Sequence, residues 1–237
     1  SFTAFKVDGS VVMWGNPTGG YYGGGSVQQP PSKIYGVKKA ATTYAATAVL
    51  TASGDIYAWG NSVEGGGAAG DGHRHNSPAD SGYTDIVGGW ATFAALRADG
   101  SIRTWGGGPE QPWWGDPEIG SVTKTPTDAG YTHIVANGAT ATSFAAMKAD
   151  GSITTWGMIN HNPPGSGYTK IVPSENAFTA IRTDGSLYSW NADGALADTP
   201  TVSDITQVVA NANAFAAIRE DGSVVTWGDS ASGGDSD

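Results

Sequence analysis

Few side chains in this 237-residue sequence have the types and spacing that catalytic chemistry requires. It contains no G-x-S-x-G nucleophile elbow, no H-E-x-x-H zinc motif and no Walker phosphate loop. Gly65–Gly70 matches G-x-G-x-x-G, but it follows a Trp-Gly pair and precedes a polar loop. No helix N-terminus is therefore expected to meet a pyrophosphate there. Since the chain also has no cysteine, thiolate metal sites, disulfides and cysteine nucleophiles are excluded. We expect no cofactor.

The histidine-rich segment is the one metal-ligand pattern in the sequence. His73 and His75 flank Arg74 and follow Asp71, and two histidines at this spacing can share a metal ion in an extended loop. The guanidinium of Arg74 would oppose a cation, so a solvated loop is the favoured interpretation. We expect no metal site.

Acidic residues outside the repeat described below could act as a general acid and base. Glu64, Asp116 and Glu118 all fall in predicted loops. A glycosidase-like pair needs an apolar or like-charged pocket that raises one of the two pKa values. The sequence contains no pattern for such a pocket, so we expect a non-enzymatic protein with no catalytic residue.

The strongest candidates for binding are aromatic. Trp113 and Trp114 lie side by side in the proline-braced insertion Gly108–Glu118. Exposed tryptophan rings stack on sugar faces or anchor in a pocket of a partner protein. The alternative is that this loop folds back and buries both rings. Tyr21 and Tyr22, within the glycine-rich stretch Gly19–Gly25, form a weaker candidate of the same kind.

These candidates interrupt a hairpin that occurs six times, with an Asp-Gly turn between two short strands and a tryptophan at its end. The repeated residues are Trp14, Trp59, Trp105, Trp156, Trp190 and Trp227, with Asp8, Asp99, Asp150, Asp184 and Asp221. The second copy has Ser53-Gly54-Asp55 in place of the turn. A two-residue Asp-Gly loop predicts a type I′ turn, with positive φ at both positions.

A further apolar strand precedes five of the hairpins: Ile34–Val37, Ile86–Val87, Ile134–Val135, Ile171–Val172 and Val208–Val209. Phe93–Leu96 is apolar on both faces, which predicts burial on both sides. Neighbouring tryptophans are 34 residues (Trp156 to Trp190) to 51 residues (Trp105 to Trp156) apart. Radial repetition of about 40–50 residues is typical of a β-propeller.

The prediction is therefore an all-β chain that forms a single β-propeller domain over residues 1–237. The six repeats span approximately 1–31, 32–80, 81–128, 129–164, 165–202 and 203–237. We expect a closed ring of six blades, with a seven-bladed ring or an open fragment of a longer array as alternatives.

Two segments carry a family resemblance. The run from Ala95 through Asp99 and Gly100 to Trp105-Gly106 resembles the repeat of the regulator-of-chromosome-condensation family. Trp59-Gly-Asn through Asp71, followed by Pro78, is similar to that family's Trp-Gly-x-Asn…Gly-Asp…Pro segment. The residues of these two segments are most similar to those of bacterial members of the family, which occur in secreted and cell-surface proteins. The resemblance implies four-stranded blades and, as in the family's namesake, nucleotide exchange on a small GTPase.

Charge and composition narrow the function. The net charge is −10, and no run of Lys or Arg offers a phosphate-tracking surface, so we expect no nucleic-acid partner. No apolar stretch is long enough to insert into a membrane. The cysteine-free composition fits an extracellular protein, or one on a cell or virion surface. We predict a recognition or adhesion module that binds a surface glycan or protein through variable loops. The alternative is an assembly domain of a fibre, large adhesin or toxin, with identical or sister chains as partners.

Overall fold

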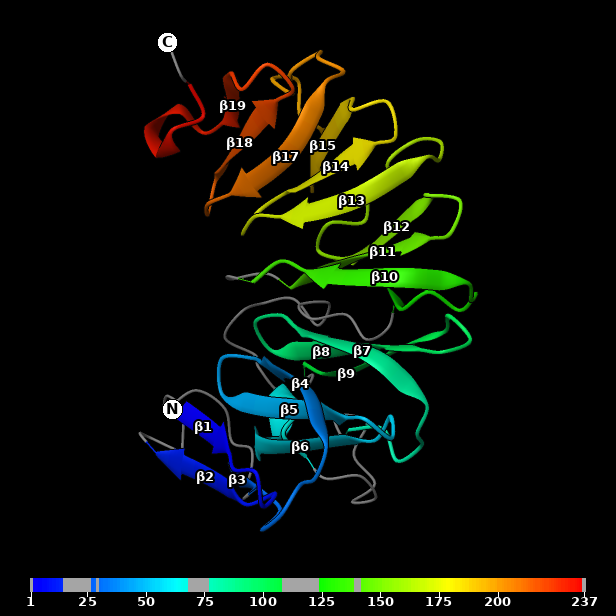
Figure 1. The fold of residues 1–237 in the computed structure, drawn as a ribbon, viewed down its shortest axis with the longest axis vertical. Coiled ribbons are helices and arrows are strands. Elements are labelled where there is room, and N and C mark those ends of the chain that lie inside the picture. Colours follow the sequence, from blue (N-terminus) through cyan, green and yellow to red (C-terminus); the bar gives the residue numbers. More distant parts are fainter. Residues whose placement is uncertain are drawn as a thin grey trace.

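The computed structural model describes residues 2–14, 27–28, 30–67, 77–107, 124–138 and 142–235, and these residues form six antiparallel sheets (Figure 1). The first sheet pairs β1 (Phe2–Phe5) with β2 (Val11–Trp14). The second consists of β4 (Val37–Thr42), β5 (Ala46–Thr51), β6 (Ile56–Asn61) and the short β3 (Val27–Gln28) on the outer edge of β6. The third consists of β7 (Tyr83–Gly88), β8 (Thr92–Arg97) and β9 (Ile102–Gly106).

The remaining three sheets repeat this order of strands. The fourth contains β10 (Tyr131–Ala136), β11 (Ser143–Lys148) and β12 (Ile153–Gly157). The fifth contains β13 (Tyr168–Pro173), β14 (Phe178–Arg182), β15 (Leu187–Asn191) and the short β16 (Gly194–Ala195). The sixth contains β17 (Ile205–Ala210), β18 (Ala214–Arg219) and β19 (Val224–Gly228). Single-turn 3₁₀ helices follow β6 and β19: η1 (Ser62–Glu64) and η4 (Ser230–Ser232).

The sheets follow one another along an open arc, with the N-terminus beside the first sheet and the C-terminus beside the sixth (Figure 1). The first strands β4, β7, β10, β13 and β17 lie next to one another along this arc. Among the described strands, β1 pairs only with β2 and β19 only with β18. The described strands therefore form an open arc, in which the first and sixth sheets do not pair; the number of blades and the closure of the ring stay predictions.

The core lies between successive sheets and is built from one residue pattern. The Phe–Trp pairs of sheets three to six stack with ring centroids 5.2, 5.3, 5.4 and 5.4 Å apart. In the third sheet, Phe93, Ala95 and Trp105 face the second sheet, while Ala94, Leu96 and Ile102 face the fourth. Every residue of Phe93–Leu96 is buried, so burial on both faces is confirmed. Truncating such a ring costs about 3–5 kcal/mol, so these layers dominate stability.

The Asp-Gly turns differ from the type I′ prediction. In the third sheet Gly100 N–H donates to Arg97 O (3.0 Å) and Arg97 N–H donates to Ser101 O (2.9 Å). Gly100 has φ +79°, and no described residue other than glycine has a positive φ. This is a three-residue loop, a type I turn followed by a left-handed glycine bulge. The reason is the carboxylate of Asp99, which accepts the Ser101 amide (2.8 Å) and hydroxyl (2.6 Å).

One predicted strand is displaced. The second sheet's first strand, β4, begins at Val37, where Ile34–Val37 was expected. Ile34 is instead buried ahead of the strand, and its N–H donates to Gly9 O of the first sheet at 2.7 Å. The other four predicted apolar pairs lie within β7, β10, β13 and β17. The apolar character of Ile34 therefore serves contact between sheets rather than strand pairing.

Candidate interaction surface

The topology gives the arc two different edges. All Asp-Gly turns, which join the second and third strands, lie at one edge; we call it the turn edge. The turns between first and second strands lie at the other, which we call the loop edge. The chain leaving each third strand also starts at the loop edge, because β8 and β9 pair Thr92 with Gly106. The variable connections that follow each Trp-Gly pair therefore begin on a single side of the molecule.

The aromatic residues predicted to bind a ligand lie outside the described residues. They are Trp113, Trp114, Tyr21 and Tyr22. The candidate metal ligands and acids His73, His75, Asp116 and Glu118 also lie outside the described residues. The strands that precede the two aromatic segments, β2 and β9, both end at the loop edge. Binding by these four residues stays a prediction.

Two other aromatic residues meet at the loop edge. Tyr44 is 57% exposed, and its ring lies 6.0 Å from that of Trp90, tilted by 34°. Tyr44 N–H donates to Trp90 O (2.8 Å), and Trp90 N–H donates to Thr142 Oγ1 (2.9 Å). The pair thus joins the second, third and fourth sheets. The Trp90 ring is half-buried.

Sequence reasoning missed Tyr44, although a signal was present. Tyr44 and Trp90 each stand fifteen residues before the repeat tryptophan of their sheet, Trp59 and Trp105. The fifth sheet has Glu175 at this position, and Glu175 N–H donates to Ala212 O of the sixth sheet (3.0 Å) as Tyr44 N–H does to Trp90 O. Aligning the turns as well as the tryptophans would have placed both aromatic side chains in one repeat position.

Glu64 supports the turn that carries Tyr44. Its side chain is 6% exposed, and its carboxylate accepts the Ala45 N–H at 2.6 Å. Burial raises the pKa of Glu64 to about 7, and the hydrogen bond from Ala45 only partly opposes that shift. In the described part of the chain, no three His, Cys, Asp or Glu residues cluster as metal ligands would. Glu64 therefore holds the backbone of the turn at Ala45 in place.

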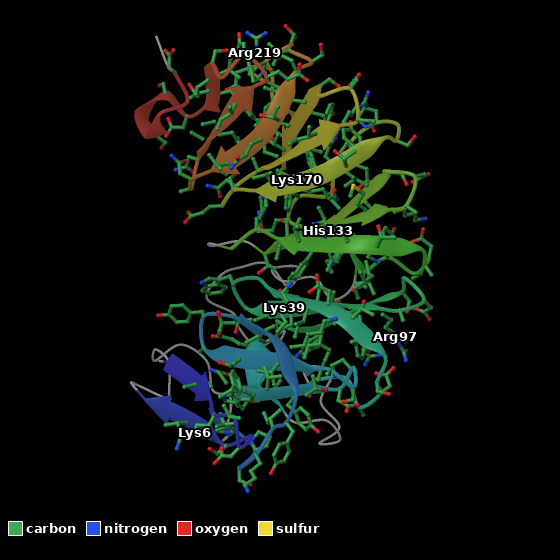
Figure 2. All side chains as sticks on the ribbon, in the orientation of Figure 1. Lys6, Lys39, Arg97, His133, Lys170 and Arg219 are labelled. Atoms are coloured by element: carbon green, nitrogen blue, oxygen red, sulfur yellow. The ribbon has the colours of Figure 1, made fainter. Side chains whose placement is uncertain are left out.

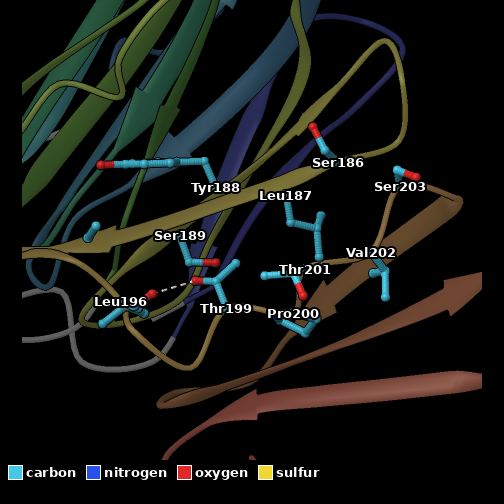
Figure 3. Close-up of a pocket in the computed structure, with 11 residues that line it drawn as sticks. Ser186, Leu187, Tyr188, Ser189, Leu196, Thr199, Pro200, Thr201, Val202 and Ser203 are labelled. Atoms are coloured by element: carbon cyan, nitrogen blue, oxygen red, sulfur yellow. Dashed lines mark hydrogen bonds between the residues drawn. The ribbon is translucent and has the colours of Figure 1, made fainter.

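A cavity of about 330 Å³ opens between the fifth sheet and the segment that leads into the sixth (Figure 3). Its lining consists of Ser186, Leu187, Tyr188, Ser189, Ala195, Leu196, Thr199, Pro200, Thr201, Val202 and Ser203. The Tyr188 hydroxyl lies 2.8 Å from His161 Nε2, with the two rings nearly parallel at 9°. Hydroxyl and apolar groups with no charged side chain suit a neutral polar ligand.

The first strands carry a row of polar side chains across the arc, of which Lys39, His133 and Lys170 are labelled in Figure 2. Lys39 Nζ lies 2.5 Å from Asp85 Oδ1. Burial lowers the pKa of His133, while the Asp85 carboxylate opposes that shift. The Asp85 carboxylate lies beside Lys39, and the lowered pKa of His133 disfavours its charged form, so this row is not a continuous basic surface for a polyanion.

No protein-family model matches the chain, and no curated protein matches it. Solved structures do match. Human WBSCR16 is 15% identical, over 81% of this chain and 61% of that one, with a TM-score of 0.54. Yeast RCC1 (Prp20), solved bound to Kap60, is 17% identical over 81% of this chain and 56% of that one, with a TM-score of 0.52. The CRINKLY WD40 ectodomain of the Arabidopsis thaliana receptor kinase ACR4 is 18% identical over 84% and 70%, with a TM-score of 0.52.

These likenesses establish the fold. The chain has an all-β, RCC1-like β-propeller architecture, as the sequence predicted. It spans 61% of the human protein and 56% of the yeast one. Among the described residues, no helix is long and apolar enough to cross a membrane. Fold alone assigns no activity, since propellers serve many functions.

Proposed function

We propose that this chain is a non-enzymatic recognition module that binds a partner protein through its loop edge. The observation that carries this proposal is the Tyr44–Trp90 pair, in which a 57% exposed tyrosine stands against a half-buried tryptophan. Tyrosine and tryptophan are enriched at the energetic centres of protein interfaces. Both backbones are fixed by hydrogen bonds to neighbouring sheets, so little conformational entropy remains to be lost on binding.

The rest of the loop edge extends this proposal. Trp113 and Trp114, and more weakly Tyr21 and Tyr22, follow strands that end at the same edge as Tyr44. We propose that they complete one aromatic surface, displayed outside a cell or on a virion as in the bacterial secreted proteins that the sequence resembles. The yeast structure of similar fold contains a protein partner, Kap60, which shows that this architecture is compatible with protein binding.

A glycan is the second candidate ligand, and the cavity beside the fifth sheet favours it. Several hydroxyl groups, apolar side chains and no charged side chain match the neutral, hydroxyl-rich surface of a sugar. The family resemblance offers a third candidate, nucleotide exchange on a small GTPase, which an exchange assay with purified GTPases tests directly. An assembly role in a fibre, adhesin or toxin is the fourth.

Tyr44→Ala tests the main proposal. Binding of the purified chain is measured against an array of cell-surface proteins and an array of glycans. We expect roughly tenfold weaker binding to the protein ligand and an unchanged melting temperature, because the Tyr44 ring is largely exposed. Trp113→Ala/Trp114→Ala should weaken the same interaction. Tyr35→Ala is the matched control, because Tyr35 is also exposed (62%) but lies beside Gly9 at the turn edge.

The outcomes separate the candidates. Wild-type binding by Tyr44→Ala, with the ligand identified on the array, would overturn the loop-edge assignment. Binding to glycans alone, lost in Thr201→Val and kept in Tyr44→Ala, would establish the second candidate instead, since Thr201 lines the cavity.

A further inference from the structure

The outer face of the sixth sheet is apolar and exposed where the equivalent faces of the other sheets are buried. Ile218 is 42% exposed and Val224 is 56% exposed. The residues at the same positions of the third sheet, Leu96 and Ile102, are 3% and 9% exposed because the fourth sheet covers them. The sixth sheet thus has the composition of a covered face without a cover among the described residues.

This face also holds a buried hydroxyl group that lacks a hydrogen-bond partner among the described residues. At the preceding interface, the indole N–H of Trp227 donates to Ser189 Oγ of the fifth sheet at 2.9 Å. Thr226 occupies the position of Ser189, immediately before the sheet's tryptophan. Its Oγ1 is buried, and no described residue hydrogen bonds to it. A buried hydroxyl without a partner is costly, and an incoming indole N–H would satisfy it.

The two 3₁₀ turns support the same conclusion. Gly65 follows η1 and Gly233 follows η4, each six residues after its sheet's tryptophan. The third sheet covers Gly65: a Cβ there would lie 2.8 Å from the Phe93 ring, and Trp105 Nε1–H donates to Gly65 O at 3.1 Å. Gly233 has nothing within 4 Å of the same position among the described residues. The place that the next Phe–Trp pair would fill is open.

The turn edge shows the same pattern. Gly54, Gly100, Gly151 and Gly185 each accept an N–H from the first residue of the next sheet's first strand. A Cβ on these glycines would lie 2.9, 2.5, 2.4 and 2.8 Å from the next sheet or its connection. Gly222, the equivalent glycine of the sixth sheet, has nothing within 4 Å in the described part of the chain.

We propose that this face, defined by Ile218, Val224, Thr226 and Gly233, binds the first sheet of a second copy of this chain. The third to sixth sheets each present a phenylalanine, an alanine and a tryptophan to the sheet before them, as Phe93, Ala95 and Trp105 do in the third sheet. The first repeat has the same residues at Phe2, Ala4 and Trp14. The contact therefore continues the internal interface between chains.

A second copy can supply this cover. The first and sixth sheets lie at opposite ends of the arc (Figure 1), so they do not cover each other within the described part of one chain. A contact between different surfaces of identical chains is heterologous, and it produces rings or filaments. This proposal concerns the sixth sheet alone and does not depend on the proposed role of the loop edge.

The mass of the full chain in solution tests this proposal, by light scattering after size-exclusion chromatography over a concentration series. We expect the wild-type mass to rise towards twice the monomer mass and beyond. Ile218→Glu/Val224→Glu should remain monomeric, because two carboxylates cannot be buried against the incoming rings. Its melting temperature at low concentration should be unchanged, because both side chains are exposed in the single chain. Met158→Glu, which alters a 45% exposed methionine elsewhere, is the control and should associate as the wild type does.

A mixing experiment tests the head-to-tail arrangement. Trp14→Glu blocks the first sheet, and Ile218→Glu/Val224→Glu blocks the sixth. Each variant alone should be monomeric, and an equimolar mixture should form dimers only. Self-association of Trp14→Glu would overturn the assignment of the first sheet. A wild-type chain that stays monomeric throughout the series, or associates equally with Ile218→Glu/Val224→Glu, would overturn the proposal itself.

Discussion

The two edges of the arc follow opposite rules. At the turn edge five of the six hairpins carry Asp-Gly-Ser, and each aspartate accepts both the amide and the hydroxyl of its serine. The second hairpin exchanges the two residues, and Ser53 Oγ donates to Asp55 Oδ2 at 2.6 Å. At the loop edge the equivalent positions hold Tyr44, Trp90, Glu175 and Ala212.

This difference follows from what each edge must do. A turn-edge glycine packs against the next sheet and supplies it with a backbone acceptor, so its geometry is restricted by two sheets at once. A loop-edge side chain extends from a turn whose backbone is already held by neighbouring sheets, so its type can vary. The repeated residues of the turn edge thus belong to the scaffold, and the variable side chains of the loop edge form the surface that is available for recognition.

The largest expected effect tests the restriction at the turn edge. Gly100→Ala places a Cβ 2.5 Å from Gly130 N in a residue with φ +79°, so steric overlap adds to backbone strain. We expect a loss of about 3 kcal/mol in the free energy of unfolding, measured by urea denaturation. Gly222→Ala is the matched control, with φ +82° but no neighbour within 4 Å. It should cost about 1 kcal/mol at low protein concentration. Equal losses would show that backbone strain alone governs this edge.

The second prediction concerns the buried carboxyl at the loop edge. Burial raises the pKa of Glu64 from its ordinary value of 4.5 to about 7. The unfolded chain therefore loses this proton at lower pH than the folded chain does. Stability should fall as the pH rises from 4.5 through 7, and the loss is about 3 kcal/mol at pH 8.

Glu64→Gln measures this contribution, because the amide oxygen can still accept the Ala45 N–H without carrying a charge. We expect the variant to be about 3 kcal/mol more stable than the wild type at pH 8 and equal to it at pH 4. Urea denaturation across the pH range provides the comparison. Parallel curves for the two proteins would mean that Glu64 ionises in the folded chain as it does in water.

The sequence predicted the hairpins because each is a local pattern: turn residues, alternating small and aromatic residues, and a closing tryptophan. It did not predict the turn type, since Asp-Gly fits both a two-residue loop and a three-residue loop. The bond from Asp99 to Ser101 decides between them. The contacts between sheets could not be predicted from the sequence either. Neither the Tyr44–Trp90 pair nor the burial of Glu64 follows from neighbouring residues, because both depend on how sheets from different repeats pack.

The smallest expected effect concerns the basic residues of the turn edge. Arg97 donates hydrogen bonds to Asp80 Oδ2 (2.7 Å) and Ser81 O (2.8 Å), and its guanidinium lies 5.3 Å from the centre of the Tyr83 ring. It therefore ties the hairpin to the segment entering its own first strand.

Arg97→Gln should lower the free energy of unfolding by only about 0.5–1 kcal/mol, since the ion pair is partly exposed and its strength is modest. The loss should shrink in high salt, because screening weakens the charge term in the wild type. Arg103→Gln, on an exposed position of β9 in the same sheet, is the control and should change stability by less. A loss above about 2 kcal/mol for Arg97→Gln would place these basic residues among the structural determinants of the turn edge, beside its glycines.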